Sequence, residues 1–243
     1  MPGIAVCTAM FELMGLHSYY GKSHVVQGIS LNVGDGEAVG LVGRNGVGKT
    51  TTLKSIVGLV AGTKGRVLLN GADMASRPTH LRAALGIGYV PEERAVFPNM
   101  TVEENIRIGA MLLSGNRDSV LTTAYDLFPL LRERRSQLAG TLSGGQQKML
   151  GLARGLALRP KLLLVDEPSE GLMPINMELI ARALLKATDE GISVLVVDAS
   201  FDLLRIACKR LYVMDNGILT GSYRPGDFSN PDQLAATYLG AGA

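Results

Sequence analysis

The sequence predicts an α/β fold with a mainly parallel β-sheet that helices cover on both faces. Short aliphatic runs alternate with helical segments along the chain, and parallel strands need such helical crossovers between them. The 243 residues suffice for one large domain or two small ones, and 47% of them are hydrophobic, with no Trp. This composition favours a core of Val, Ile, Leu and Ala with glycine in the turns.

Aliphatic runs and turn signals define the expected elements in order. The pairs Asn70-Gly71 and Asn216-Gly217 are typical of two-residue hairpin turns. A helix is expected directly after the glycine-rich loop that follows residue 42. The expected strands are residues 11–20, 28–33, 37–42, 66–69, 162–165, 193–197, 212–215 and 218–222, and the expected helices at either end of the chain are 48–58 and 174–188.

The middle of the chain, residues 78–158, has a different pattern. Its apolar residues recur mostly at helical spacing, as in residues 120–131, and Pro91, Pro98 and Pro129 punctuate it. We therefore expect a helical insertion within the α/β domain.

Charge and cysteine content narrow the classes of function. The net charge of +2 gives no reason to expect nucleic-acid binding, and Glu133 interrupts the short basic run at residues 132–135, as in a solvated helix face. Cys7 and Cys208 lie far apart without metal-ligand spacing, which favours a reduced, cytoplasmic protein. No run of 18 apolar residues occurs, so the chain is not expected to span a membrane by itself.

The segment 43–50 matches the phosphate-binding pattern of glycine, four residues, then Gly-Lys-Thr, between an expected strand and an expected helix. Glycines let backbone N–H groups close around phosphate oxygens, and the N-terminus of the following helix faces the same anion. Lys49 places a positive charge on the β- and γ-phosphates of ATP, and the Thr50 hydroxyl is a ligand for Mg²⁺. The residues expected to bind the nucleotide here are Gly43, Arg44, Asn45, Gly46, Val47, Gly48, Lys49, Thr50 and Thr51.

A second buried strand, residues 162–165, delivers acidic residues to the same edge of the sheet. Asp166 and Glu167 follow it directly, and ligands bind at the carboxyl ends of strands in open α/β sheets. We expect Asp166 to hold Mg²⁺ and Glu167 to accept the proton of the attacking water, with Lys49 as a further catalytic group. A helix-capping pair is the alternative interpretation of the two acids.

A family resemblance rests on the segment Leu142-Ser143-Gly144-Gly145-Gln146-Gln147, which resembles the LSGGQ signature of ABC ATPases. Taken alone, this segment is typical of an N-capped helix, because Ser143 is a favoured cap. Residues 162–168 also resemble the Walker B strand of that family and follow the signature in the expected order. The resemblance implies a head-to-tail dimer in which Ser143, Gly144, Gly145 and Gln146 of one chain cover the ATP that the other chain binds.

Several further segments resemble the smaller of the two ATP-binding subunits of branched-chain amino acid importers, a group that includes urea and amide importers. These are residues 89–92, 96–98, 100–105, 127–129, 133–135 and 169–174. The resemblance implies one ABC ATPase domain over residues 1–243, with ATP and Mg²⁺ as cofactors. Its implied parts are a P-loop NTPase core at about 1–88 and 160–243, an antiparallel β subdomain, and a helical subdomain at about 89–159.

The same resemblance implies partners and a location. The expected partners are a second, non-identical ABC ATPase subunit or a second copy of this chain, two membrane permease subunits, and a periplasmic or extracellular solute-binding protein. The expected location is the cytoplasmic face of the inner or plasma membrane, as a peripheral subunit. Nucleic acid is not an expected partner.

An aromatic residue in the first strand matches the position that stacks on adenine in the family. We favour Tyr20 for this role, and Tyr19 is the alternative. Side chains alternate along a strand, so the two rings are expected on opposite faces and only one of them can stack.

Three positions depart from the general ABC pattern. Glu92 stands where many relatives have the Q-loop glutamine; we expect it to act in catalysis as a Mg²⁺ ligand, and a plain surface-loop glutamate is the alternative. Met173 stands in place of the D-loop aspartate, and Ala199 in place of the switch histidine. Alanine has no side-chain hydrogen-bonding group to offer the γ-phosphate, and the hydroxyl of Ser200 is the alternative donor.

We expect an ATP-hydrolysing subunit of an ABC importer that powers uptake of branched-chain amino acids or a related small polar solute. Two alternatives are a soluble ABC ATPase without a membrane partner, and a degenerate ATP-binding subunit with weak hydrolysis at its own site. No residue excludes export rather than import. The solute is expected to be selected by the binding protein and the membrane subunits, so this sequence does not reveal it.

Overall fold

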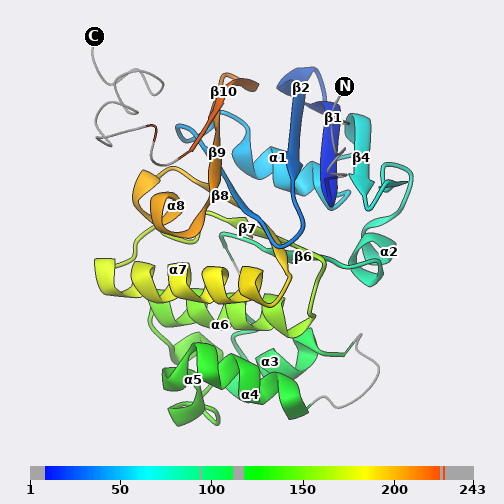
Figure 1. Ribbon diagram of the computed structural model, residues 1–243. Coiled ribbons are helices and arrows are strands. Elements are labelled where there is room, and N and C mark those ends of the chain that lie inside the picture. Colours follow the sequence, from blue (N-terminus) through cyan, green and yellow to red (C-terminus); the bar gives the residue numbers. More distant parts are fainter. Residues whose placement is uncertain (1–8, 94, 112–117, 225–226, 228–243) are drawn as a thin grey trace, which may run out of the picture.

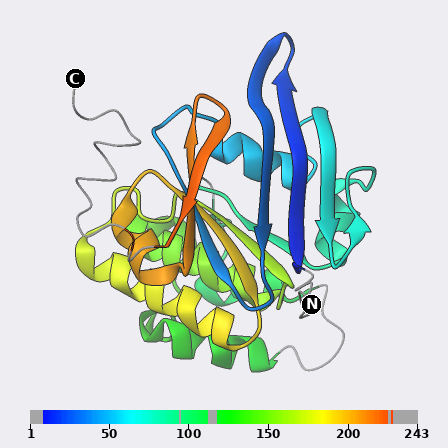
Figure 2. The same ribbon diagram turned by 45° about the horizontal axis from the view of Figure 1, so that its top comes forward.

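The computed structural model of the protein describes residues 9–93, 95–111, 118–224 and 227. Its elements lie in layers (Figure 1): a small antiparallel sheet, helix α1, a larger sheet, helices α6 and α7, and then α3 to α5. Figure 2 shows the long β1–β2 hairpin standing beside the larger sheet. The expected α/β class with a helical part in the middle of the chain is confirmed.

The larger sheet has the strand order β10-β9-β3-β8-β7-β6. Neighbouring strands from β9 to β6 pair in parallel, and only the β10–β9 pair is antiparallel among the described residues of this sheet. The mainly parallel sheet that the sequence predicts is therefore confirmed. Its strands are β3 (Ala38–Val42), β6 (Ile87–Val90), β7 (Leu162–Asp166), β8 (Ser193–Asp198), β9 (Arg210–Asp215) and β10 (Ile218–Tyr223).

The smaller sheet has the order β2-β1-β4-β5, and all its pairs are antiparallel. It contains β1 (Phe11–Tyr20), β2 (Ser23–Val33), β4 (Gly62–Leu69) and β5 (Ala72–Asp73). Strand β2 begins five residues before the expected start at residue 28, because its polar first residues pair with the end of β1. This sheet is the antiparallel part that the family resemblance implies.

Both expected hairpin turns are present. Asn70 and Gly71 join β4 to β5, and Asn216 and Gly217 join β9 to β10. All four residues have positive φ angles, between 46° and 83°, as a tight turn with φ above zero at both central positions requires.

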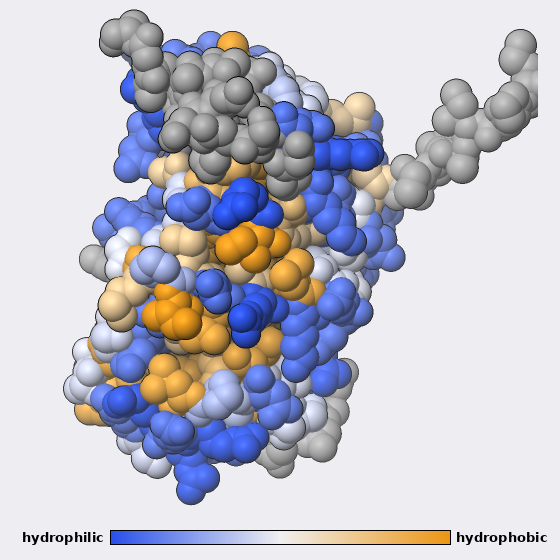
Figure 3. All heavy atoms as spheres, turned by 60° about the vertical axis from the view of Figure 1, so that its left-hand side comes forward, coloured by the Kyte–Doolittle hydropathy of each residue, from blue (hydrophilic) through white to orange (hydrophobic). Residues whose placement is uncertain are grey.

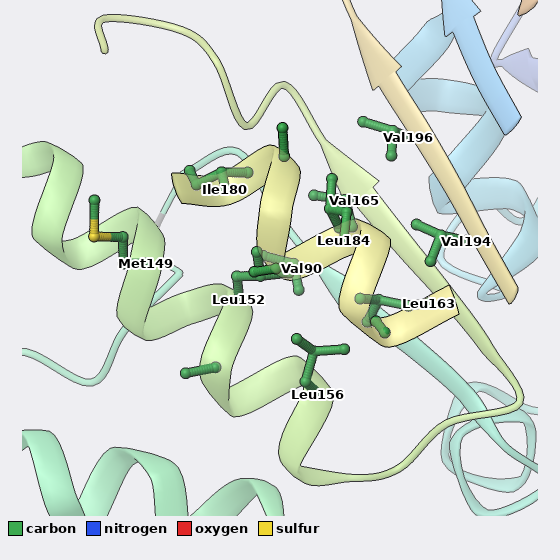
Figure 4. Close-up of a cluster of buried hydrophobic side chains, with 14 of the residues drawn as sticks. Val90, Met149, Leu152, Leu156, Leu163, Val165, Ile180, Leu184, Val194 and Val196 are labelled. Atoms are coloured by element: carbon green, nitrogen blue, oxygen red, sulfur yellow. The ribbon is translucent and has the colours of Figure 1, made fainter. Parts of the chain in front are cut away.

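Each of the two faces of the larger sheet packs against a neighbouring layer. Residues of β7 and β8 alternate between two hydrophobic clusters, with Leu163, Val165, Val194 and Val196 in one and Leu162, Leu164, Leu195 and Val197 in the other. Figure 4 shows the first set beside Leu152 and Leu156 of α6 and Ile180 and Leu184 of α7. The second cluster includes Leu53 and Ile56 of α1 and the inward side chains of β1 and β2. Burial on both faces explains why these strands are continuous aliphatic runs.

The helices divide between the sheet faces and the middle of the chain. Helix α1 (Lys49–Ile56) lies between the two sheets, and α7 (Pro174–Asp189) and α8 (Phe201–Ala207) cover the other face of the larger sheet. The remaining helices are α2 (Thr79–Ala84), α3 (Val102–Gly109), α4 (Asp118–Leu127), α5 (Pro129–Glu133), a short 3₁₀ turn (Ala139–Thr141) and α6 (Gly144–Ala157). None of the helices in the described ranges is long and apolar enough to cross a membrane.

The structure differs from the sequence-based expectations in the middle of the chain. The segment 78–158 contains strand β6, which pairs with β7, so the proposed boundary at about residue 88 falls inside a core strand. The helix expected at 120–131 is two helices, because the backbone of Phe128 is not helical, with φ of −136° and ψ of 82°, and Pro129 starts α5. Helix α8 was not expected. Cys208 is buried, and Cys7 lies outside the described residues.

Candidate functional site

Three parallel strands end at the same edge of the larger sheet. Strand β3 leads into the glycine-rich loop, β7 ends at Asp166, and β8 ends at Asp198. The pairing register aligns Val42 with Asp198, and Asp166 with Val197. The segment 43–50 and the acidic residues that the sequence predicts for the site therefore meet at this edge.

The glycine-rich loop is closely surrounded by backbone. A side chain at Gly43 would collide with the carbonyl oxygen of Met214, and one at Gly48 would lie 2.9 Å from the Met214 side chain. Gly48 also has a φ angle of 114°, which glycine adopts at little cost. Helix α1 starts at Lys49, so its N-terminus opens onto the loop. A cavity of about 140 Å³ lies there, lined by Val25, Gly46, Gly48, Lys49, Thr50, Thr51 and Glu167.

The Lys49 ammonium group is satisfied by the protein in this structure. Its Nζ donates to the carbonyl oxygens of Gly43 at 2.7 Å and of Arg44 at 3.1 Å, and it lies 3.0 Å from Oε1 of Glu167. Only 3% of the Lys49 side chain is exposed. Phosphate oxygens that enter the cavity would offer this buried cation a stronger charge partner than the carbonyl groups. The carboxylate of Glu167 would then be released from the ion pair.

Asp166 binds two hydroxyl groups. Oγ1 of Thr50 donates to its Oδ1 at 2.9 Å, and the Tyr89 hydroxyl donates to its Oδ2 at 2.9 Å. Burial raises the pKa of Asp166, while the two hydrogen bonds oppose that shift. Adjacent oxygen ligands of an octahedral Mg²⁺ lie about 3.0 Å apart when each is about 2.1 Å from the metal, so the spacing of the Thr50 and Asp166 oxygens is compatible with this ion.

Glu92 follows β6 at the same edge of the sheet. A hydrogen bond with the Glu170 carboxyl group, together with burial, raises the pKa of Glu92 to about 7, and the charges of Asp166 and Glu167 act in the same direction. The close carboxyl group of Glu170 favours the protonated form of Glu92, because two adjacent carboxylates repel each other. The Glu92 side chain thus belongs to the acidic cluster of the site, and its role as a Mg²⁺ ligand stays a prediction.

The backbone of Glu167 adopts a left-handed conformation, with φ of 44°. Its N–H donates to the carbonyl oxygen of Val197 at 2.8 Å, and its own carbonyl oxygen accepts from Nζ of Lys148 at 2.8 Å. Non-glycine residues with this conformation are uncommon and cluster at functional sites. The strain lies at the residue that the sequence predicts as the catalytic base.

Asp198 joins the segment after β7 to the segment after β8. Its carboxylate accepts hydrogen bonds from the N–H and the hydroxyl of Ser169 at 3.0 and 2.7 Å, and from the N–H of Ser200 at 2.8 Å. The Ser200 hydroxyl in turn caps helix α8 by accepting from the N–H of Asp202. Ser200 is therefore engaged away from the phosphate loop and does not fill the place of the missing side chain at Ala199 in this structure.

The signature segment begins helix α6 as an N-capped helix. Ser143 and Gln146 form a reciprocal capping box, with N···O distances of 3.1 and 3.4 Å. Ser143 and Gly144 are exposed, and a side chain at Gly144 would meet no atom within 4 Å. The capping role is thus confirmed, and the open glycine-rich N-terminus stays available for the predicted contact with a nucleotide on a second chain.

The two tyrosines at the end of β1 differ in their surroundings. The Tyr19 ring stacks on the His24 ring, with centroids 4.3 Å apart, and the Lys64 ammonium lies 5.6 Å from its centroid. The Tyr20 side chain is 50% exposed. These contacts favour Tyr20 as the ring that stacks on adenine, and this role stays a prediction.

The turn between β9 and β10 contacts the phosphate loop. The N–H of Gly217 donates to the carbonyl oxygen of Val47 at 3.0 Å, and the carbonyl oxygen of Gly217 accepts from the N–H of Gln27 at 2.8 Å. The Gln27 side chain also donates to the carbonyl oxygen of Asn216. This turn therefore links the phosphate loop to strand β2 of the smaller sheet.

Sequence reasoning missed Tyr89 and Lys148 as site residues. The sequence pattern does not indicate strand β6, which carries Tyr89, and the aromatic residue two positions before Pro91 is the one signal for it. Lys148 follows the signature segment, and the sequence alone holds no signal that its side chain reaches Glu167.

Fold and site together define a P-loop ATPase domain with an inserted helical part. The family model described as "ABC transporter" matches residues 26–170. The high-affinity branched-chain amino acid transport ATP-binding protein BraG of Pseudomonas aeruginosa is 38% identical over 209 residues, which cover 86% of this chain and 90% of that protein. The lipopolysaccharide export system ATP-binding protein LptB of Haemophilus influenzae is 34% identical over 235 residues, with coverage of 91% and 93%.

Solved structures of ATP-binding cassettes share the fold. The ADP conformation of MJ1267 has a TM-score of 0.80 at 24% identity, covering 94% of this chain and 95% of that one. The dimeric structure of MJ0796 has a TM-score of 0.80 at 25% identity, with coverage of 89% and 99%. The chain belongs to the ABC transporter family and is an ATP-hydrolysing subunit of a transporter.

Proposed function

We propose that this subunit powers the import of branched-chain amino acids or a related small polar solute. The observation that carries this proposal is the 38% identity to BraG, a branched-chain amino acid transport protein. The resemblance to the smaller importer ATPase supports import as well. Two of the segments that carry this resemblance contain Glu92 and Glu170, and both residues lie in the acidic cluster of the site. Lipopolysaccharide export is the second candidate, since LptB matches a larger share of the chain.

The residues at the sheet edge support the following division of labour in hydrolysis. Lys49 and the loop N–H groups bind the β- and γ-phosphates, and Thr50 and Asp166 hold Mg²⁺, with Glu92 as a further ligand. A Mg²⁺ ion held by these residues would supply positive charge to offset the charge that develops on the phosphate oxygens. Glu167, released from Lys49, accepts the proton of the water whose oxygen attacks the γ-phosphorus as the bond to ADP breaks.

A dimer completes this site in the proposal. Ser143 to Gln146 of one chain cover the nucleotide bound by a second, non-identical ATPase or by a second copy. Hydrophobic side chains gather on the face shown in Figure 3. Separately, Met173 and Ile175 at the start of α7 are 64% and 61% exposed. Exposed apolar side chains of this size favour burial by a partner. In the proposal this subunit sits at the cytoplasmic face of the membrane, where it binds two membrane permease subunits, and a periplasmic or extracellular solute-binding protein completes the assembly on the other side.

The proposal is tested in cells that carry the gene and depend on its transporter. Lys49→Ala removes the main charge on the phosphates, and we expect it to abolish uptake of radiolabelled leucine, isoleucine and valine. Lys186→Ala, on the exposed face of α7, is the matched control and should leave uptake unchanged. Normal amino-acid uptake with Lys49→Ala, accompanied by loss of lipopolysaccharide from the cell surface, would refute import in favour of export.

A further inference from the structure

Lys148 lies in the first turns of α6, close behind the signature residues at its N-terminus. Its side chain runs from this helix to the end of β7, where Nζ donates to the carbonyl oxygen of Glu167 at 2.8 Å. The contact therefore joins helix α6 to the residue that directly follows strand β7. Lys148 thus ties the start of the signature helix to the predicted catalytic base.

The contact falls on a strained part of the backbone. Strand β7 ends at Asp166, and Glu167 turns out of the sheet with φ of 44°. Its N–H is held by Val197 of β8, and Lys148 holds its carbonyl oxygen. The two hydrogen bonds fix both ends of the residue, so they determine where its side chain leaves the backbone. That side chain lies 3.0 Å from Lys49 in the phosphate loop.

The charge of Lys148 also matches its surroundings. Burial lowers the pKa of Lys148, and the carboxylates of Glu170, Asp198, Glu92 and Glu167 raise it. A half-buried cation among four carboxyl groups reduces their mutual repulsion. An apolar side chain of similar size, such as methionine, would supply neither the hydrogen bond nor this charge.

We propose that Lys148 is a positioning residue for ATP hydrolysis, which holds Glu167 in its left-handed conformation and so aims its carboxylate at the phosphate loop. This inference rests on the proposed role of Glu167 as the base. Nucleotide binding depends instead on the loop N–H groups and Lys49, which Lys148 does not contact. Lys148 therefore acts on the turnover number and leaves ATP affinity nearly unchanged.

The test compares full-length variants for steady-state ATPase activity, for ATP affinity with a fluorescent ATP analogue, and for thermal unfolding. We expect Lys148→Met to lower kcat about 10- to 100-fold, as small displacements of a catalytic group do, with ATP affinity within about twofold of wild type. Lys148→Arg, which keeps the charge and the donor, should restore most of the activity. Lys186→Met is the control for the substitution itself.

Other results separate the possible failures. A Lys148→Met protein with wild-type kcat overturns the inference, as does a parallel loss of kcat and affinity that Lys148→Arg does not rescue. If Lys148→Met fails to fold, the ATPase activities of Lys148→Gln and Lys148→Arg are compared instead. Equal activity of these two variants overturns the inference about Lys148. Glu167→Gln is assayed alongside: if it keeps full activity, the role of Glu167 as the base fails, whatever Lys148 does.

Discussion

Arg82 holds the C-terminal end of the helix that carries the phosphate loop. It lies in α2, is 6% exposed, and donates to four backbone carbonyl oxygens. Two of these acceptors, Ser55 and Ile56, belong to the end of α1, at 3.0 and 2.6 Å, and the others are Ala75 and Arg77. The cation also lies where the α1 dipole is negative. We predict that Arg82→Met destabilises the fold strongly.

The magnitude follows from these contacts. Each hydrogen bond from a charged donor contributes about 1.5–3 kcal/mol, and a buried acceptor left without a partner costs about 1–3 kcal/mol. Methionine fills part of the space, water reaches some of the carbonyl groups, and the four contributions are not additive. We therefore expect the free energy of unfolding to fall by about 3–5 kcal/mol, a large share of the about 5–15 kcal/mol typical of a domain.

Urea unfolding followed by circular dichroism measures this loss, with comparison of the transition midpoints and slopes. Arg77→Met is the matched control, because Arg77 is exposed and contributes only its carbonyl oxygen to this cluster. Arg82→Lys should fall between the two, since it keeps the charge with fewer donors. A loss below about 1 kcal/mol for Arg82→Met would show that the carbonyl groups do not depend on the guanidinium.

Three further predictions concern the site. Tyr20→Ala should weaken ATP binding about tenfold, since stacking on a base contributes about 1–3 kcal/mol. Because the folded-state pKa of Glu92 is raised from 4.5 to about 7 by Glu170 and burial, the metal-free protein should lose stability as pH rises from about 4.5 to 7, and Glu92→Gln should remove this dependence. Ala199→Gln restores a donor near the γ-phosphate and should raise kcat by up to about 100-fold.

Each prediction has its own control. Tyr19→Ala should leave ATP affinity nearly unchanged, and a larger loss than with Tyr20→Ala would move the adenine contact to Tyr19. Urea midpoints of the wild type that stay flat from pH 4.5 to 7 would contradict the raised pKa of Glu92. Ala199→Leu adds bulk without a donor, so a similar gain in kcat from both Ala199 variants would show that hydrogen bonding is not the cause.

The sequence predicted the parts of the site that depend on local backbone. The loop before α1, the pair Asp166-Glu167 after β7 and the two hairpin turns each need particular residue types, and all stand at the edge or turn expected for them. Their positions follow from strand order and from the φ angles that glycine and asparagine permit.

The missed features depend on contacts between distant segments. Strand β6 has only four residues, includes Gly88 and is followed by Pro91, so its extended form results from pairing with β7 and not from its own pattern. Lys148 and Glu167 are 19 residues apart in the sequence, and the hydrogen bond between them depends on how α6 packs against the sheet. Pattern and propensity along the chain carry no information about such distances.

The two-residue turn at Asn216-Gly217 changes how variation in the last third of the chain should be interpreted. Short surface turns usually tolerate substitution and insertion, so a change there would ordinarily be judged harmless. Here a side chain at Gly217 would collide with the carbonyl oxygen of Val25. The N–H of Gly217 also donates a hydrogen bond to the carbonyl oxygen of Val47 in the phosphate loop. An added residue or a substitution at position 217 should therefore act like a defect in the nucleotide site, although it lies about 170 residues away in the sequence.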